Sequence, residues 1–213
     1  MEVMNRFIAI KASIDGFPQE SDFEIKTETL SLSIGVGTNQ VLVKNLYVSI
    51  DPYQLNCIKS HSLAIYFSAA IIPGEAIDTY GVGRVVESEK PEFEKGDLVV
   101  GLLSWGEYTI VKEGALLNKL DPMGFPLPHH VGTLGFSGLA AYGGFFEVCK
   151  PRKGETVFVS AASGSVGCLV GQYAKLFGCY VVGCAGTRKK VDLLKQELGF
   201  DDAFNYKEET DLK

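Results

Sequence analysis

The sequence lacks the signals that mark membrane, nucleic-acid-binding and exported proteins. No apolar run in its 213 residues approaches the roughly 18–20 residues that a membrane-spanning helix needs. The formal net charge of −6 disfavours binding of nucleic acid through a basic face. Residues 1–13, MEVMNRFIAIKAS, show no cationic leader region and no clear cleavage site. We therefore interpret this segment as part of the fold and expect a cytoplasmic protein.

Cysteine and histidine are scarce and are poorly spaced for disulfides or metal binding. The five cysteines are odd in number and include no CxxC pair, so a disulfide framework is not expected. His129 and His130 are adjacent, but they follow Pro126 and Pro128 and have no Cys or His partner nearby. We interpret this pair as a loop or packing element rather than as metal ligands.

The first half of the chain contains short β-like runs separated by turn residues. These runs are residues 40–50, 81–87, 97–103 and 107–111. Their length and spacing predict an antiparallel or barrel-like β domain.

The second half changes character and predicts the order β-α-β-α-β. The expected strands are residues 156–160, 179–184 and 203–206, and the expected helices are residues 165–177 and a segment with Val191, Leu194 and Leu198 on one stripe. Gly178 and Gly199 end these helices, and Thr187 caps the second. The order predicts parallel strands with right-handed crossovers. Before them, the apolar residues 133–149 predict a buried helix.

A run of small residues, SAASGSVG, stands where the first of these strands meets its helix. A dinucleotide-binding unit needs a tight turn, close backbone approach to a pyrophosphate and close helix–strand packing, which is usually written GxGxxG. Here Ala162, Gly164 and Gly167 occupy the three glycine positions. The first helical amides, from Ser165 through Val166 and Gly167 to Cys168, are then expected to donate to phosphate oxygens. The alternative is a tight turn with no ligand.

The lack of an acidic residue after the next strand distinguishes between the two nicotinamide cofactors. NAD-binding units usually place an acidic residue about 20 residues past the glycines, to hold the ribose 2′-OH. No Asp or Glu lies between Cys179 and Val191, where the chain reads CAGTRKK instead. A 2′-phosphate carries about two negative charges, which this basic cluster would favour. We therefore predict NADPH; the alternative is a solvated cationic patch at a helix start.

Taken together, these residues resemble the zinc-independent medium-chain dehydrogenase/reductases, in particular the plant NADP-dependent alkenal double-bond reductases. The matching pieces are VLVKNLYVSIDPY (residues 41–53), AYGGFFEVC (141–149), the long stretch 157–186, and 191–209. The resemblance runs through nearly the whole chain, and the second half is the more specific part.

The resemblance implies an α/β protein that reduces the C=C bond of α,β-unsaturated aldehydes and ketones with NADPH. It implies a GroES-like substrate domain at residues 1–126 and, at 127–213, the first βαβαβ half of a Rossmann-like doubly wound parallel sheet. Hydride would add to the β-carbon, charge would accumulate on the carbonyl oxygen, and Tyr53 would contact the substrate there. The expected cofactor-binding residues are Ala162, Gly164, Ser165, Val166, Gly167, Cys168, Gly186, Thr187, Arg188, Lys190 (at the 2′-phosphate) and Tyr206. The alternative for Tyr53 is a tyrosine packed at a strand end, and from composition alone Tyr206 is equally well explained as an aromatic residue of a strand in the core.

The resemblance also implies the absence of a metal, because zinc-dependent relatives carry a Cys, a GHE histidine and a four-cysteine lobe. The corresponding stretch here reads PGEAID, and no cysteine cluster exists.

Two departures from the family pattern leave alternatives open. Members usually continue DPY with Met-Arg, whereas this chain reads DPYQLN and then diverges over residues 57–70, so substrate preference stays open. The chain stops at Lys213, before a second Rossmann half and the region that forms the family's homodimer. We therefore expect low or no catalysis from this chain alone. The alternatives are a zinc-independent quinone reductase and a truncated, non-catalytic nucleotide-binding protein.

Overall fold

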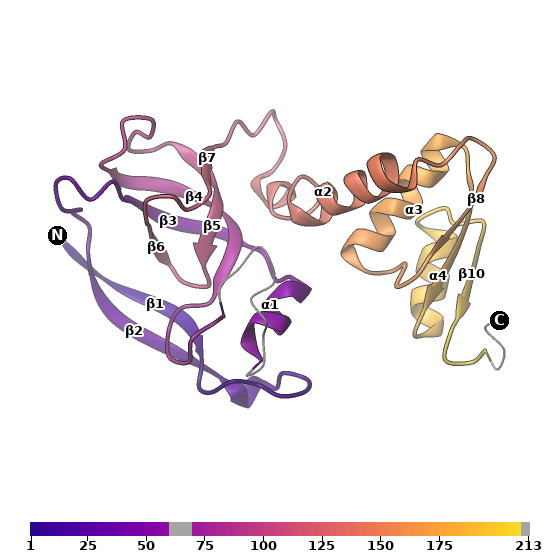
Figure 1. Cartoon of the computed structure of the whole chain (residues 1–213), viewed down its shortest axis with the longest axis horizontal. Coiled ribbons are helices and arrows are strands. Elements are labelled where there is room, and N and C mark those ends of the chain that lie inside the picture. The colour runs from indigo at the N-terminus through magenta and orange to yellow at the C-terminus, as the bar shows by residue number, and fades with distance from the viewer. Residues whose placement is uncertain (60–69, 210–213) are drawn as a thin grey trace. The chain divides into compact units, whose positions relative to one another are not determined.

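The computed structural model describes residues 1–59 and 70–209 and consists of two compact units, Met1–Val131 and Gly132–Lys213 (Figure 1). The sequence placed the domain boundary after residue 126, just before the 3-10 helix η2 (Leu127–His130) that ends the first unit. Each unit has its own hydrophobic core and is described by itself.

Antiparallel strands form most of the first unit, as the sequence predicted. A five-stranded sheet has the order β6-β3-β4-β5-β7, and a separate pair joins β1 to β2. The strands are β1 (Glu2–Ile10), β2 (Phe23–Ser31), β3 (Val41–Val48), β4 (Asp78–Ser88), β5 (Leu98–Ser104), β6 (Tyr108–Val111) and β7 (Leu117–Lys119); a 3-10 helix, η1 (Glu20–Asp22), precedes β2. Alternate β-branched residues such as Val41, Val43 and Val99 are fully buried in the core of the sheet.

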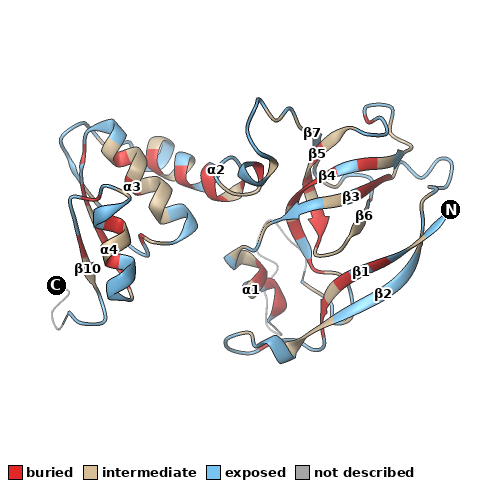
Figure 2. Ribbon diagram, turned by 180° about the vertical axis from the view of Figure 1, so that it is seen from behind, coloured by how far each residue is buried: buried red, intermediate tan, exposed pale blue. Residues whose placement is uncertain are grey.

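A second apolar cluster in this unit anchors the helix α1 (Pro52–Ile58). Ile58 at the end of α1 packs there with Ile10 of β1 and with Ile77, all of them buried. Figure 2 shows buried residues on both α1 and β1. The end of α1 is thereby held against β1 and against the residue that precedes β4.

The second unit has the predicted β-α-β-α-β order. Its three strands, β8 (Thr156–Val159), β9 (Tyr180–Ala185) and β10 (Asp202–Asn205), are parallel and have the order β10-β9-β8. The helices α3 (Ser165–Phe177) and α4 (Arg188–Gln196) connect them. Gly178 ends α3 with a φ of 84°, and the Thr187 hydroxyl caps α4 by accepting from the amide of Lys190, as the sequence predicted.

Both helices pack on the same face of this sheet. Val181 and Ala203 of the strands are buried there together with Ala174 of α3 and Leu194 of α4. Phe200 fills the space between α3 and β9, where a Cβ on Gly171 would lie 2.0 Å from its ring and one on Gly183 would lie 2.8 Å from it. Glycine is therefore required at both positions for steric reasons.

The predicted buried helix over residues 133–149 is wrong in its start and in its burial. The structure has α2 (Phe136–Tyr142) followed by a π-helix, η3 (Gly143–Cys149). Only one face packs against α3, through Ala141 and Phe145, whereas Leu139 and Val148 are 68% and 79% exposed. The apolar composition of the stretch predicted burial on all sides, but only one neighbouring helix covers it in this unit.

The remaining sequence expectations concern histidines, thiols and membranes. His130 is buried in η2 with its Nε2 atom 3.3 Å from the Pro122 carbonyl oxygen. All five cysteines are free thiols. Among the described residues, none of the helices has both the length and the apolar character that crossing a membrane requires.

Candidate functional site

A pocket of about 280 Å³ lies at the carboxyl ends of the three parallel strands in the second unit. Its lining comes from three segments: Ala161, Ser163 and Gly164 after β8; Ala185 at the end of β9, with Gly186 and Thr187 after it and Lys190 in the first turn of α4; and Tyr206 and Lys207 after β10. This edge of an open α/β sheet is where such folds bind their ligands.

The loop after β8 explains why this site tolerates alanine in place of the first motif glycine. Ala162 is fully buried, and its amide donates to the Cys184 carbonyl oxygen at 3.0 Å, which ties the loop to β9. Its methyl group occupies space that the neighbouring strand leaves open, because a Cβ on Gly183 would come within 2.9 Å of it. The extra carbon at position 162 is thus accommodated by the missing one at position 183.

The other two motif glycines have distinct steric roles. Gly164 is the N-cap of α3 and follows a tight turn in which its amide donates to the Ala161 carbonyl oxygen at 2.8 Å. A Cβ on Gly167 would lie 2.6 Å from that same oxygen and 2.8 Å from the Ala162 Cα atom. Gly167 therefore permits the close approach of helix and loop that the motif requires.

The first turn of α3 keeps amides available for an anion. The N-cap makes no side-chain capping bond, because glycine has no side chain. The Cys168 amide already donates to the Gly164 carbonyl oxygen at 2.9 Å. The amides of Ser165, Val166 and Gly167 are therefore the ones that this geometry leaves to a phosphate group.

The predicted basic cluster divides into residues that line the pocket and residues that do not. Lys190 lines it, beside Thr187 at the start of α4. Arg188 does not line it; its side chain is 83% exposed and its Nε atom lies 3.7 Å from Asp192 Oδ1.

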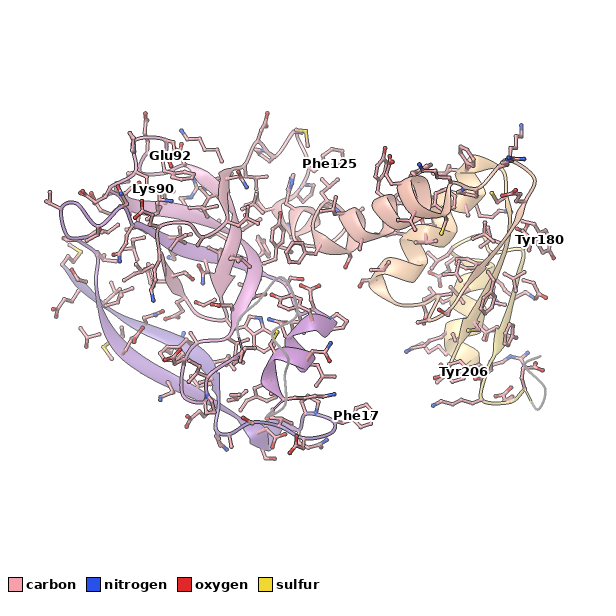
Figure 3. The ribbon with its side chains drawn as sticks, viewed as in Figure 1. Phe17, Lys90, Glu92, Phe125, Tyr180 and Tyr206 are labelled. Atoms are coloured by element: carbon pink, nitrogen blue, oxygen red, sulfur yellow. The ribbon has the colours of Figure 1, made fainter. Side chains whose placement is uncertain are left out.

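The tyrosine after β10 also belongs to the pocket. Tyr206 is 43% exposed rather than buried in the core, and its amide donates to the Ala185 carbonyl oxygen at 3.2 Å (Figure 3). Its hydroxyl lies over Gly186, where a Cβ would come within 3.1 Å of it. The pocket thus brings together Gly164, Gly186, Thr187, Lys190 and Tyr206 of the predicted set.

Sequence reasoning missed two polar residues of the pocket, Ser163 and Lys207. Both follow a predicted strand in the sequence, Ser163 after β8 and Lys207 after β10. The rule that ligand-binding residues gather at the carboxyl ends of parallel strands is the signal that could have found them.

Tyr53 belongs to the first unit, in the first turn of α1. Pro52 starts this helix, and Asp51 and Gln54 form a capping box in which Gln54 Oε1 accepts from the Asp51 amide at 2.9 Å. Burial, followed by the nearby carboxylates of Asp51 and Asp78, raises the pKa of the Tyr53 hydroxyl above its ordinary value. A tyrosine hydroxyl is protonated at neutral pH, and this shift extends the protonated range of Tyr53 to higher pH, so the group can act as a donor.

The residue that departs from the family pattern after DPY has a structural role here. Gln54 is only 2% exposed, and its Nε2 atom donates to the Asp78 carbonyl oxygen at 2.9 Å. It therefore connects α1 to β4 as well as capping the helix. The divergent segment 57–70 lies mostly outside the described residues.

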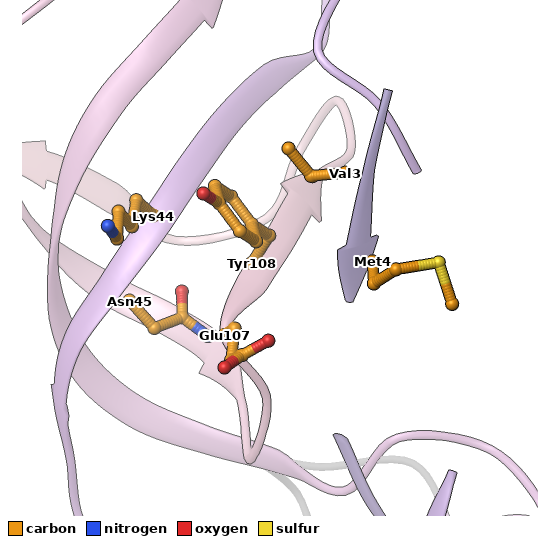
Figure 4. A pocket seen from close by; sticks show the side chains of 6 residues that line it. All are labelled: Val3, Met4, Lys44, Asn45, Glu107 and Tyr108. Atoms are coloured by element: carbon orange, nitrogen blue, oxygen red, sulfur yellow. The ribbon is translucent and has the colours of Figure 1, made fainter. Parts of the chain in front are cut away.

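A second pocket, of about 340 Å³, lies in the first unit and holds none of the predicted residues (Figure 4). It is lined by Val3, Met4, Lys44, Asn45, Glu107 and Tyr108. Glu107 is already paired with Arg6, whose Nη2 lies 2.6 Å from Oε1, and this contact lowers the pKa of Glu107. Within the described part of the chain, no group of three or more His, Cys, Asp or Glu residues is placed to hold a metal ion.

Comparison with known proteins places these two units in one family. Residues 6–120 match the family described as the N-terminal domain of oxidoreductase, and residues 165–213 match the one described as zinc-binding dehydrogenase. The fold is similar to that of CurA from Vibrio vulnificus in complex with NADPH, with a TM-score of 0.81 and 29% identity, covering 95% of this chain and 58% of that one.

Two plant enzymes are similar over almost all of this chain. It is 52% identical to a 2-alkenal reductase (NADP(+)-dependent) of Nicotiana tabacum and 50% identical to a (+)-pulegone reductase of Mentha piperita, covering 99% and 98% of this chain. It spans 61% of the length of each of these relatives. With an antiparallel first unit, a parallel βαβαβ second unit and a matching family over more than half of its residues, the chain belongs to the medium-chain dehydrogenase/reductase family of oxidoreductases.

Proposed function

We propose that the protein binds NADPH in the pocket of the second unit and reduces the C=C bond of α,β-unsaturated aldehydes or ketones. The observation that carries the proposal is the pocket itself, where an uncapped helix N-terminus, small residues and Lys190 meet at the ends of three parallel strands. The names of the two plant relatives support the substrate class.

The residues present fit a phosphorylated dinucleotide. The amides of Ser165, Val166 and Gly167 would hold the pyrophosphate, helped by the positive end of the α3 dipole. Side chains are absent where backbone must approach closely, at Gly164 and Gly186. Lys190 and Tyr206 would hold the adenosine 2′-phosphate, in agreement with the lack of an acidic residue between the end of β9 and Val191.

Residues 1–126 would supply the substrate side, and residues 127–213 the cofactor side. NADPH, when bound, supplies the hydride that adds to the β-carbon. Tyr53 would donate a hydrogen bond to the carbonyl oxygen as negative charge develops there, since a tyrosine hydroxyl is protonated at neutral pH. Asp51 and Gln54 fix the turn that presents this tyrosine.

The test follows NADPH oxidation by its near-ultraviolet absorbance, with a 2-alkenal, a simple cyclic enone and a quinone as separate substrates. In a form extended to the length of its plant relatives, oxidation that depends on the alkenal or enone, and that falls at least about tenfold in Tyr53→Phe, is the expected result, whereas the 213-residue chain alone should turn over little. Turnover of the quinone alone would favour a quinone reductase. A folded protein to which NADPH does not bind, measured by calorimetry, would exclude the proposal.

A further inference from the structure

We propose that Lys207, and not Arg188, is the second cation that acts beside Lys190 to select a dinucleotide carrying a 2′-phosphate. The inference rests on the cofactor site proposed above and deepens it by naming a specificity-determining residue. Sequence reasoning assigned this role to the cluster Thr187–Lys190 at the start of α4. The structure instead places a lysine from the far end of β10 in the pocket.

The position of Lys207 follows from its contacts around Gly186. A Cβ built on Gly186 would lie 3.4 Å from Lys207 Cε and 3.1 Å from the Tyr206 hydroxyl oxygen. The stem of Lys207 and the ring of Tyr206 therefore both cover the backbone of the β9 loop, which also carries Thr187. Lys190 lines the same pocket from the first turn of α4. Two cations from different strand ends thus converge on one small volume.

The turn after β10 holds Lys207 in this place. Asn205 Oδ1 accepts from the Lys207 amide at 3.2 Å, and the Asn205 carbonyl oxygen accepts from the Glu208 amide at 3.0 Å. The Asn205 side-chain amide also donates to Glu208 Oε1 at 2.6 Å. The adjacent carboxylate is therefore engaged by Asn205 and leaves the Lys207 ammonium group for a ligand.

Ion pairs in the second unit engage two of its other lysines, neither of which lines the pocket. Lys175 pairs with Asp201 at 2.6 Å, and Lys195 pairs with Asp202 at 3.0 Å. Within residues 132–209, neither Lys190 nor Lys207 forms an ion pair. Two such ammonium groups beside the positive end of α4 match the charge of a phosphate dianion.

Arg188 lacks these features although it stands in the predicted cluster. It is the first residue of α4, does not line the pocket, and faces Asp192 one turn along the exposed side of the helix. An exposed pair of this kind contributes little, so Arg188 is a suitable matched control for removing one positive charge.

The experiment measures binding of adenosine 2′,5′-bisphosphate and of AMP to the whole chain by calorimetry. The variants are Lys207→Gln, Lys207→Arg and Arg188→Gln, each with its fold checked by circular dichroism. We expect Lys207→Gln to weaken bisphosphate binding by about tenfold or more, the effect of one lost charge-assisted hydrogen bond, and to leave AMP binding within about twofold. Lys207→Arg should retain most of the preference for the bisphosphate, and Arg188→Gln should change it by less than about threefold.

The outcomes separate this inference from the proposed function. Equal effects of Lys207→Gln and Arg188→Gln, or a larger effect of Arg188→Gln, would overturn the role of Lys207 and leave the cofactor site intact. A folded wild-type chain that binds the bisphosphate no better than AMP would overturn both.

Discussion

Gly167 shows at the level of one residue how a motif position is determined by its neighbours. The glycine is needed because the Ala161 carbonyl oxygen lies 2.6 Å from where its Cβ would be. The obstructing atom belongs to the backbone of a turn in which Ala161 itself has a positive φ of 46°, so it cannot swing aside like a flexible side chain.

Gly167→Ala is expected to lower the free energy of unfolding by about 1–3 kcal/mol, because the added methyl group forces helix and loop apart. It should also weaken NADPH binding, since the displaced amides are those proposed to hold the pyrophosphate. Denaturant unfolding and calorimetry measure the two effects. Gly144→Ala is the matched control, because a Cβ there meets no atom within 4 Å. Equal stability of the two variants would contradict this account.

Single residues were predictable from the sequence where the local pattern alone determines their role. Gly164, Gly167 and Thr187 occupy positions that a strand–turn–helix pattern defines. Lys207 was missed because its place depends on the turn that Asn205 makes after β10. The alanine at position 162 could be read as a substitution, but its compensation by Gly183 needs the pairing of β8 with β9.

At the scale of elements, α1 is held to β4 by one buried side chain. Gln54 accepts from the Asp51 amide within the helix cap and donates to the Asp78 carbonyl oxygen of β4. From the sequence, this position indicated only the loss of the family's usual Met-Arg pair. In the structure, Gln54 helps to orient the turn that carries Tyr53.

Gln54→Met keeps the side-chain length but removes both hydrogen bonds, which leaves the Asp51 amide and the Asp78 carbonyl oxygen without the partner that the buried Gln54 side chain supplies. We expect the free energy of unfolding to fall by about 1–3 kcal/mol. Urea denaturation provides the measurement, and Asn56→Ala, at an exposed position of the same helix, is the control. Unchanged stability of Gln54→Met would show that the connection to β4 is dispensable.

Elements with clear ends were predicted closely, whereas continuous apolar stretches were not. Residues 165–177 match α3 in both bounds, because small residues begin the helix and Gly178 ends it. Residues 133–149 contain no clear start or stop signal for a helix. The pattern of apolar residues also does not show where α2 changes into the π-helix η3.

At the scale of the whole molecule, paired carboxylates stabilise both units in the same pH range. Hydrogen bonds from Lys119 and Arg6 lower the pKa values of Asp97 and Glu107 in the first unit. Lys175 and Lys195 do the same for Asp201 and Asp202 in the second. Burial raises the pKa of Asp78, which acts in the opposite direction.

Acidification should therefore lower the melting temperature of the chain. A carboxylate whose pKa is depressed in the folded state contributes stability that is present above its unfolded pKa of about 4 and is lost as the pH falls through its folded pKa. Asp201→Asn should show a smaller loss below about pH 4 than the wild type, because asparagine does not titrate. The asparagine can still accept from the Val181 amide, as Asp201 does, so the local fold is kept. A thermal melting series across pH tests this, and identical acid dependence of the two proteins would refute it.

The ring of Phe200 fills the space between Gly171 and Gly183, so the side chains at these three positions compete for the same volume. Any homologous sequence that gains a methyl group at either glycine must shrink the aromatic residue, and one that keeps the aromatic must keep both glycines. Substitutions at 171, 183 and 200 are consequently interdependent, because the ring of Phe200 occupies the space between α3 and β9.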